Sequence, residues 1–389
     1  MPTKTPKVTI KHLQTLLARI GSATSGVKTV LHDRLTRDLR VSNVELPLPQ
    51  NATQKHKSLA KNSLRVVSID MGIKNLAFCD AKISRLDGKS LDTVMEVLRW
   101  EKIDLITSTK DLRNRLLNPQ AEERGTAIDQ EVDPFSLPLL SNTAYKLITE
   151  TILASQPDII LIEKQRWRSG GGSAILQWTV RVNTLESMLW AVLETLRSER
   201  KTIPSSTKAI DARTDYEIFA IDPKRVAHYW LEQEAPPLAV DAKQKGKLSR
   251  KNVEKKARIA LLRTWLASPT MSTASSATTP TIRFKIASNA EHVKQALHAR
   301  RNTGRPRRSK ASQEVDIEEI ADIPEVDIKK LDDITDCFMQ AAAWLRWETN
   351  RSQLQAIHRK SIQAAGSNFT ENLDDATLLT MLRKVGEDV

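Results

Sequence analysis

Short apolar runs rich in β-branched residues recur along the chain and predict the strands of a sheet. Residues 66–69 and 76–78 flank a polar stretch that contains a glycine, so we expect two strands joined by a tight turn. A third strand is expected around residues 94–100, which would complete an antiparallel meander. Residues 158–163 and 216–221 predict two further strands, and the first of these is apolar enough to be buried on both faces.

Helical spacing of apolar residues alternates with these runs. Residues 142–154 predict a crossover helix before the fourth strand, as a parallel pairing requires. Residues 173–200 predict a long helix whose apolar seam either covers the sheet or pairs with its own copy about a two-fold axis. Three more helices are expected, over residues 224–231, over a basic-led segment that runs through Trp265, and over residues 331–348.

The pattern also divides the chain into parts. Residues 1–40 predict a small helical module, and residues 41–62, with prolines and little periodicity, predict a linker. The main domain is expected over residues 63–350, followed by a C-terminal helical tail over 351–389. Within the main domain, residues 268–327 combine a Ser/Thr/Ala-rich run with a basic block and an acidic block, which predicts a poorly ordered insertion.

Acidic residues stand at the ends of two predicted strands and in the first turns of a late helix. Asp70 ends the first strand and Glu163 the fourth, while Asp332 and Asp333 precede Asp336 by four and three residues. An Asp before Gly is often only a turn residue, and acids at a helix start also favour the helix dipole. Carboxylates are, however, the hard oxygen ligands that Mg2+ takes, so together they predict a metal site.

Three sequence motifs carry these acids: residues 69–75 (Ile-Asp-Met-Gly-Ile-Lys-Asn), 162–166 (Ile-Glu-Lys-Gln-Arg) and 329–336 (Lys-Lys-Leu-Asp-Asp-Ile-Thr-Asp). In this combination the motifs resemble the RNase H-like (retroviral integrase) superfamily. More narrowly, they resemble the fungal mitochondrial Holliday junction resolvases, relatives of bacterial RuvC. The resemblance spans roughly residues 64–348, with interruptions.

This resemblance implies an α/β fold, an RNase H-like mixed five-stranded sheet flanked by helices. It implies a mitochondrial endonuclease that acts as a homodimer on four-way DNA junctions, making paired nicks in strands of like polarity during DNA recombination and segregation. Asp70, Glu163 and Asp336 would be catalytic and would hold two Mg2+ ions, with Mn2+ able to substitute. Either Asp332 or Asp333 would assist, and the sequence leaves that choice open.

The N-terminal module has a resemblance of its own. Residues 8–39, with Gly21, Thr24, Gly26 and Lys28, resemble a SAP motif, a helix-loop-helix that binds DNA in other proteins. Basic residues far outnumber acidic ones in this stretch, which favours contact with DNA. A protein-docking role is the alternative.

Charge agrees with a nucleic-acid partner. The chain has 60 Lys and Arg against 47 Asp and Glu, a net charge of +13, which favours binding to a polyanion. A nuclease for RNA–DNA hybrids or other branched DNA, and a non-catalytic junction-binding protein, remain alternatives. The candidates for DNA contact are Lys28, Lys74, Asn75, Gln165, Arg166, Arg168, Arg181, Lys251 and Lys255.

Other features narrow the picture further. Cys79 and Cys337 lie in apolar elements and are expected to be reduced core residues. No apolar run approaches the ~20 residues of a membrane span, and we expect neither a membrane nor a small-molecule substrate. The first ten residues are basic but shorter and poorer in Arg than a mitochondrial presequence, so targeting is expected to be encoded elsewhere.

Overall fold

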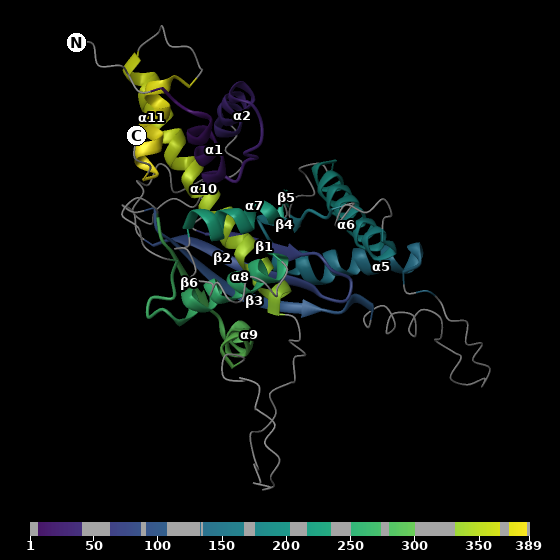
Figure 1. Ribbon diagram of the computed structural model, residues 1–389. Helices are drawn as coiled ribbons and strands as arrows, with labels where there is room; N and C mark the ends of the chain where they lie inside the picture. The colour runs from purple at the N-terminus through teal and green to yellow at the C-terminus, as the bar shows by residue number, and fades with distance from the viewer. Residues whose placement is uncertain are drawn as a thin grey trace, which may run out of the picture.

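The computed structural model describes residues 7–40, 63–86, 91–106, 133, 135–166, 176–202, 216–234, 250–273, 280–299, 331–365 and 373–386. The predicted linker, residues 41–62, and residues 300–327 of the predicted insertion lie outside the described residues. Within the described part, helices flank a central sheet, and a further group of helices stands beyond one end of it (Figure 1).

The central sheet has six strands in the order β5-β4-β1-β2-β3-β6. Their bounds are Leu64–Asp70 (β1), Leu76–Arg85 (β2), Thr93–Ile103 (β3), Ile159–Glu163 (β4), Glu217–Ile221 (β5) and Ile282–Ile286 (β6). β1, β2 and β3 form the predicted antiparallel meander. β4 pairs in parallel with β1, β5 with β4, and β6 with β3. The predicted mixed sheet flanked by helices is thus confirmed, with one strand more than expected.

Poor order was predicted over residues 268–327, and the additional strand, β6, and the helix that follows it, α9 (Ser288–Ala299), show that this prediction is wrong for residues 282–299. β6 pairs with residues 93–97 of β3. Ile282 and Phe284 are buried while the arginine and lysine after them are exposed, the alternation of an edge strand with one buried face. Because this run is only five residues long and follows Ser/Thr-rich sequence, its period is hard to recognise in the sequence.

Two apolar cores lie on opposite faces of the sheet because side chains alternate along its buried strands. On β1 and β4, Val66 and Leu161 belong to the core shared with α8, α9 and α10, whereas Val67 and Ile160 belong to the core shared with α5 and α6. The helices span Leu137–Lys146 (α5), Gln177–Thr202 (α6), Arg250–Ala267 (α8) and Leu331–Ala365 (α10). Four shorter helical segments are η2 (Leu147–Ile152), η3 (Leu153–Ser155), α7 (Pro223–His228) and η5 (Tyr229–Glu234).

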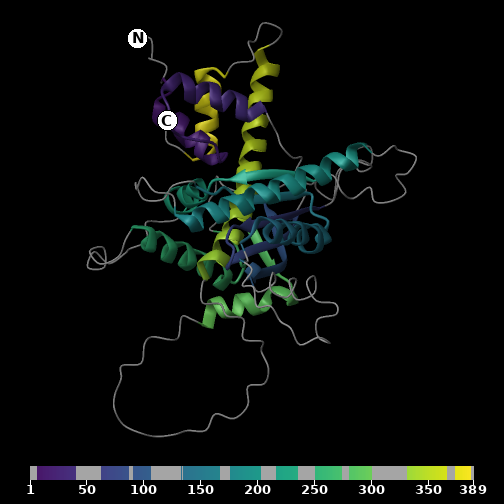
Figure 2. The ribbon, with the colours of Figure 1, turned by 90° about the vertical axis from the view of Figure 1, so that its right-hand side faces the viewer.

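A third apolar core holds the group of helices beyond the sheet, which we call the helical cap. It consists of α1 (Ile10–Arg19), α2 (Lys28–Arg40), α11 (Asp375–Lys384) and the end of α10 from residue 348 onward. α10 has 35 residues, about 50 Å at 1.5 Å per residue, and runs from the sheet into the cap (Figure 2). The N-terminal module and the C-terminal tail therefore share one core.

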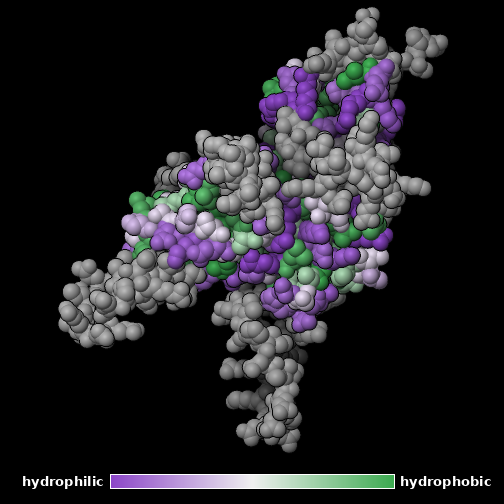
Figure 3. All heavy atoms as spheres, turned by 180° about the vertical axis from the view of Figure 1, so that it is seen from behind, coloured by the Kyte–Doolittle hydropathy of each residue, from purple (hydrophilic) through white to green (hydrophobic). Residues whose placement is uncertain are grey.

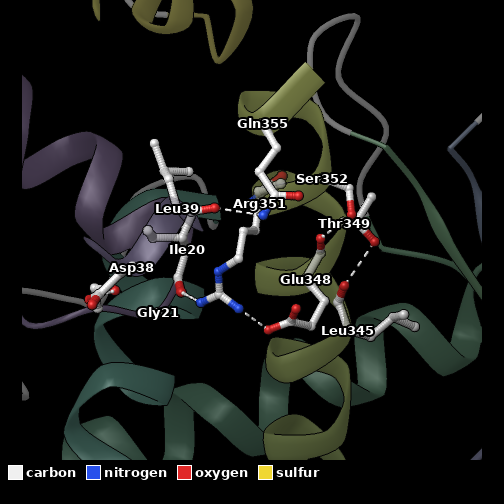
Figure 4. Close-up of polar contacts among 12 residues, drawn as sticks. Ile20, Gly21, Asp38, Leu39, Leu345, Glu348, Thr349, Arg351, Ser352 and Gln355 are labelled. Atoms are coloured by element: carbon white, nitrogen blue, oxygen red, sulfur yellow. Dashed lines mark hydrogen bonds and ion pairs between the residues drawn. The ribbon is translucent and has the colours of Figure 1, made fainter. Parts of the chain in front are cut away.

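A polar joint fastens α1 and α2 to α10 within the helical cap (Figure 4). Arg351 on α10 donates a hydrogen bond to the carbonyl oxygen of Ile20 at 2.9 Å and forms an ion pair with Glu348. Gln355 donates to the carbonyl oxygen of Leu39 at 2.6 Å. These carbonyls end α1 and α2, where no residue of the helix itself can satisfy them.

The chain leaves α1 through a glycine that this joint requires. Gly21 has φ +70°, in the left-handed region, and a Cβ at this position would collide with the ring of Trp347 on α10. Asn350 donates to the carbonyl oxygen of Arg19 at 2.7 Å, and Arg225 on α7 donates to that of Gly21 at 3.1 Å.

No helix in the described part of the chain is both long enough and apolar enough to cross a bilayer.

Candidate active site

Asp70 and Glu163 lie at the ends of the neighbouring parallel strands β1 and β4, directly after the paired residues Ile69 and Ile162. By the alternation of side chains along each strand, both carboxyl groups are on the face that α10 covers. Asp70 is 7% exposed. Burial first, then the negative charge of Glu163 and a hydrogen bond between the two carboxyl groups, raise the pKa of Asp70 well above its ordinary value.

Two donors fix the carboxylate of Glu163. The backbone N–H of Met71 donates to Glu163 Oε2 at 3.3 Å, and the side-chain amide of Gln165 donates to the same oxygen at 3.1 Å. The backbone N–H of Gln165 in turn donates to Glu186 on α6 at 3.2 Å. Burial and the nearby charge of Glu163 raise the pKa of Glu186, which lies near Glu163 although its sequence context does not distinguish it from an ordinary helix residue.

The third group of acids is on the first two turns of α10. Asp332, Asp333 and Asp336 all act electrostatically on one another or on the strand acids. Burial raises the pKa of Asp336 to about 7, opposed by Arg258 and reinforced by Glu163, Asp332 and Asp333. The structure therefore brings together all five predicted acids, from β1, β4 and α10.

Cations from α8 contact the α10 acids. Arg258 Nη1 is 2.6 Å from Asp336 Oδ1, and Lys255 Nζ forms an ion pair with Asp332. The two cations are three residues apart on α8 and thus share a helix face. Lys255 was expected near the site as a DNA contact, whereas Arg258 was not among the candidates.

A buried amide on α10 ties the helix to β1 and β4, the two strands that end in acids. Gln340, 3% exposed, donates to the carbonyl oxygens of Ile69 and Leu161 at 3.3 and 3.4 Å. It lies one helical turn after Asp336 and thus on the same face. The sequence signal for it is slight: a single polar residue within the apolar face of a predicted helix.

The predicted DNA contacts fall into three groups. Lys74 and Asn75 follow β1, and Gln165 and Arg166 follow β4, so that both loops leave the sheet at the end that carries the acids. Arg181 on α6 instead lies over the ring of Phe135, 3.8 Å from its centroid, and faces Asp133 at 3.7 Å. Lys28 is exposed in the helical cap, away from the acids. Arg168 and the side chain of Lys251 lie outside the described residues.

The donor set suits a divalent cation in chemistry. All five acids offer hard oxygen ligands, and the pair of the buried Asp70 and the partly buried Glu163, which shares a hydrogen bond, can exchange its proton for a metal ion. Among the described residues, no three acidic, histidine or cysteine side chains are yet arranged to hold one ion. Asp332 and Asp336 instead form ion pairs with Lys255 and Arg258 of α8.

A mixed sheet with an antiparallel meander, a parallel fourth strand and acids on β1, β4 and a late helix defines the RNase H-like class of proteins. The family described as "Mitochondrial resolvase Ydc2 / RNA splicing MRS1" matches residues 66–354, about three quarters of the chain. This chain belongs to that family. The resemblance inferred from the three motifs is confirmed, and the matched range contains every predicted acid.

Two similar proteins have names that agree with this family. The chain is 26% identical over 307 residues to the mitochondrial cruciform cutting endonuclease 1 of Saccharomyces cerevisiae, covering 78% of this chain and 74% of that protein. It is 28% identical over 169 residues to the protein of the same name in Schizosaccharomyces pombe, covering 43% of this chain and 52% of that protein.

Two solved structures are also similar. The yeast mitochondrial Holliday junction resolvase Ydc2 has a TM-score of 0.48 and 20% identity, over 91% of this chain and 99% of that one. RuvC of Thermus thermophilus has a TM-score of 0.27 and 13% identity, over 62% of this chain and 98% of that one.

Proposed function

We propose that this protein is a structure-specific endonuclease that resolves four-way DNA junctions by paired nicks in strands of like polarity, in mitochondria. The observation that carries the proposal is the convergence of five acids from β1, β4 and α10, within a chain that belongs to the resolvase family. The names of the relatives, cruciform cutting endonuclease, give the substrate class.

Asp70, Glu163 and Asp336 would hold divalent cations, Mg2+ or Mn2+, with Asp332 or Asp333 assisting. Held by these acids, such cations would supply a lower pKa for an attacking water and stabilisation of the leaving 3′ oxygen. Met71 and Gln165 keep the Glu163 carboxylate oriented.

The loops after β1 and β4 would guide the cleaved strand. Lys74, Asn75, Gln165 and Arg166 leave the sheet beside the acids and would contact the backbone on either side of the cut. Arg168, Lys251 and Lys255 would extend this contact, and Arg181 is the weakest candidate because Phe135 and Asp133 engage it.

Paired nicks require two sites, and the beginning of α6 offers a surface for a second copy. Leu176, Trp178 and Val180 there are 64%, 41% and 44% exposed, and Leu137 and Tyr145 on α5 are 64% and 51% exposed. Figure 3 shows apolar side chains between polar ones on the side of the molecule that carries these helices. Burying such side chains between two copies is favourable, so we propose a homodimer.

The family description also includes RNA splicing, which makes a non-cleaving nucleic-acid binder the second candidate. The acids argue against it. Five acids that repel one another, and that would repel a polyanion, cost free energy unless they serve chemistry. A protein that only bound RNA or DNA would gain nothing from them.

The test uses a labelled four-way junction, a linear duplex with the same arms and an RNA–DNA hybrid, each with Mg2+ and with EDTA. We expect paired, Mg2+-dependent nicks in the junction alone. Asp70→Asn should lower the cleavage rate by about a thousandfold or more, the effect of losing several kcal/mol of metal-based stabilisation, while junction affinity persists. Preferential cutting of the hybrid would identify a different nuclease, and binding of RNA or DNA without cutting would favour the splicing type.

A further inference from the structure

The ion pairs between α8 and α10 take no part in the cleavage chemistry proposed above. Arg258 and Asp336 are 12% and 25% exposed at their side chains, so this pair is largely shielded from water. Lys255 is about half exposed and its partner Asp332 is 18% exposed. The Nε atom of Arg258 is buried without a hydrogen bond, so the guanidinium satisfies only part of its donors in this position.

The position of α8 is fixed by its other half. Trp265 stacks on Phe284 of β6 with ring centroids 5.7 Å apart, and packs edge-on against Trp230 at 4.7 Å. Phe284 in turn contacts Phe338 of α10. Because this aromatic cluster holds the helix in place, the cations at its other half face the acids by construction. Lys255 and Arg258 also have long side chains, which can turn from the acids toward solvent.

We infer that Lys255 and Arg258 are built-in counter-ions of the metal site, which neutralise Asp332 and Asp336 in the metal-free protein and turn to the junction's phosphates when a divalent cation takes their place. The inference rests on the proposed function. A metal ion bound to these carboxylates would repel Lys255 and Arg258 and weaken the attraction that holds them there, which favours release of the two side chains. A displaced guanidinium pairs readily with phosphate.

This arrangement makes metal and junction assist each other. Metal binding releases two cations for phosphate, and phosphate binding removes two competitors of the metal. Such a coupling is reciprocal by thermodynamic necessity, and typical couplings amount to 5- to 150-fold in affinity.

The experiment titrates the full-length protein with Ca2+, a probe ion that takes oxygen ligands, by calorimetry without DNA. Arg258→Met should bind Ca2+ at least about fivefold more tightly than the unsubstituted protein, the lower end of such couplings. Lys256→Met is the matched control, since Lys256 is exposed on the same helix beside Lys255 and its loss changes the net charge equally. This control should change the Ca2+ affinity little.

A second titration measures junction affinity by fluorescence anisotropy with Ca2+ and with EDTA. Ca2+ should tighten junction binding by the unsubstituted protein and should do so less for Arg258→Met. Circular dichroism checks folding, and Lys255→Met, at a half-exposed position, provides the same test if Arg258→Met does not fold. Ca2+ affinity of both variants equal to or weaker than that of Lys256→Met would overturn the inference.

The calorimetric arm needs neither DNA nor cleavage, and it therefore separates the two proposals. Tighter Ca2+ binding by Arg258→Met in a protein that cuts no junction would keep the counter-ions and refute the resolvase. Junction cleavage with unchanged Ca2+ affinity would do the reverse.

Discussion

The two ends of α10 solve opposite problems with polar side chains. At the sheet end, the helix brings acids to other acids, and burial and repulsion raise the pKa of Asp70 and Asp336. At the cap end, Asn350, Arg351 and Gln355 donate hydrogen bonds to carbonyls that end α1 and α2, and those carbonyls thereby gain the partners they lack. The sheet end thus keeps like charges close together, whereas the hydrogen bonds at the cap end remove the free-energy cost of leaving carbonyls without donors.

The difference in electrostatics distinguishes a ligand-binding site, at the sheet end of α10, from a purely structural contact, the polar joint. A group of like charges is tolerated where a ligand of opposite charge will bind, since ligand binding then relieves the repulsion. A joint, in contrast, must be satisfied without any ligand. Substitutions at the two ends should accordingly affect different measurements, activity at one end and stability at the other.

The largest stability effect is expected from Arg351→Met in the joint. It leaves the buried Glu348 without its ion-pair partner and the carbonyl of Ile20 without its donor. Breaking a buried pair in this way costs about 3–5 kcal/mol, measurable as a lower urea midpoint. Ser352→Ala, at the neighbouring residue, is the control and should cost far less. An unchanged midpoint for Arg351→Met would show that the joint contributes little.

At the sheet end, Gln340→Leu should reduce Mg2+-dependent cleavage about 10- to 100-fold, the usual effect of removing a group that positions metal ligands. The apolar replacement keeps the volume but frees β1 and β4 from α10. Gln355→Leu is the matched control because its amide likewise donates to a carbonyl, but in the joint. We expect it to affect stability and spare cleavage, and the reverse outcome would invert the comparison.

At the sheet end, a smaller effect is expected on the pH dependence of stability. Asp336 has a pKa of about 7 in the folded chain and near 4 when unfolded, so the folded state binds more protons between these values. Metal-free stability should therefore fall as pH rises from about 4 to about 7, and Mg2+ should restore it. We expect Tm in EDTA to be a few degrees lower at pH 7.5 than at pH 5. Asp336→Asn should reduce this difference and leave the part due to Asp70, whose pKa is also raised, and a profile equal to the unsubstituted one would speak against it.

The smallest effect is expected on the cap surface. If the SAP-like module binds DNA, Lys28→Gln should weaken junction affinity modestly and reduce the slope of log affinity against log salt by about 1, the loss of one phosphate contact. Lys384→Gln, at an exposed position on α11, is the charge-matched control. A slope unchanged by Lys28→Gln would favour a protein-docking module. Point substitution is preferable to deletion of residues 1–39, which would expose the core shared with α11.

A feature of this molecule is predictable from the sequence when residues close together in the chain determine it. The strand-end acids Asp70 and Glu163 are predictable because alternation along a strand and its end are visible within a few residues. The pairing of Lys255 with Asp332 is not, since 77 residues separate them and a basic run is ordinarily a solvated face. The shared core of α1, α2 and α11 likewise joins opposite ends of the chain, and no periodicity reports which apolar faces will meet.

The length of α10 carries a final consequence, which concerns insertions and deletions. Each residue turns an α-helix by about 100° and lengthens it by about 1.5 Å. One residue inserted between Asp336 and Asn350 would rotate either the acids away from β1 and β4 or the joint away from α1. The number of residues between Asp336 and Asn350 is thus constrained by both contacts. Insertions or deletions between them should be confined to relatives that have lost either the acids or the joint.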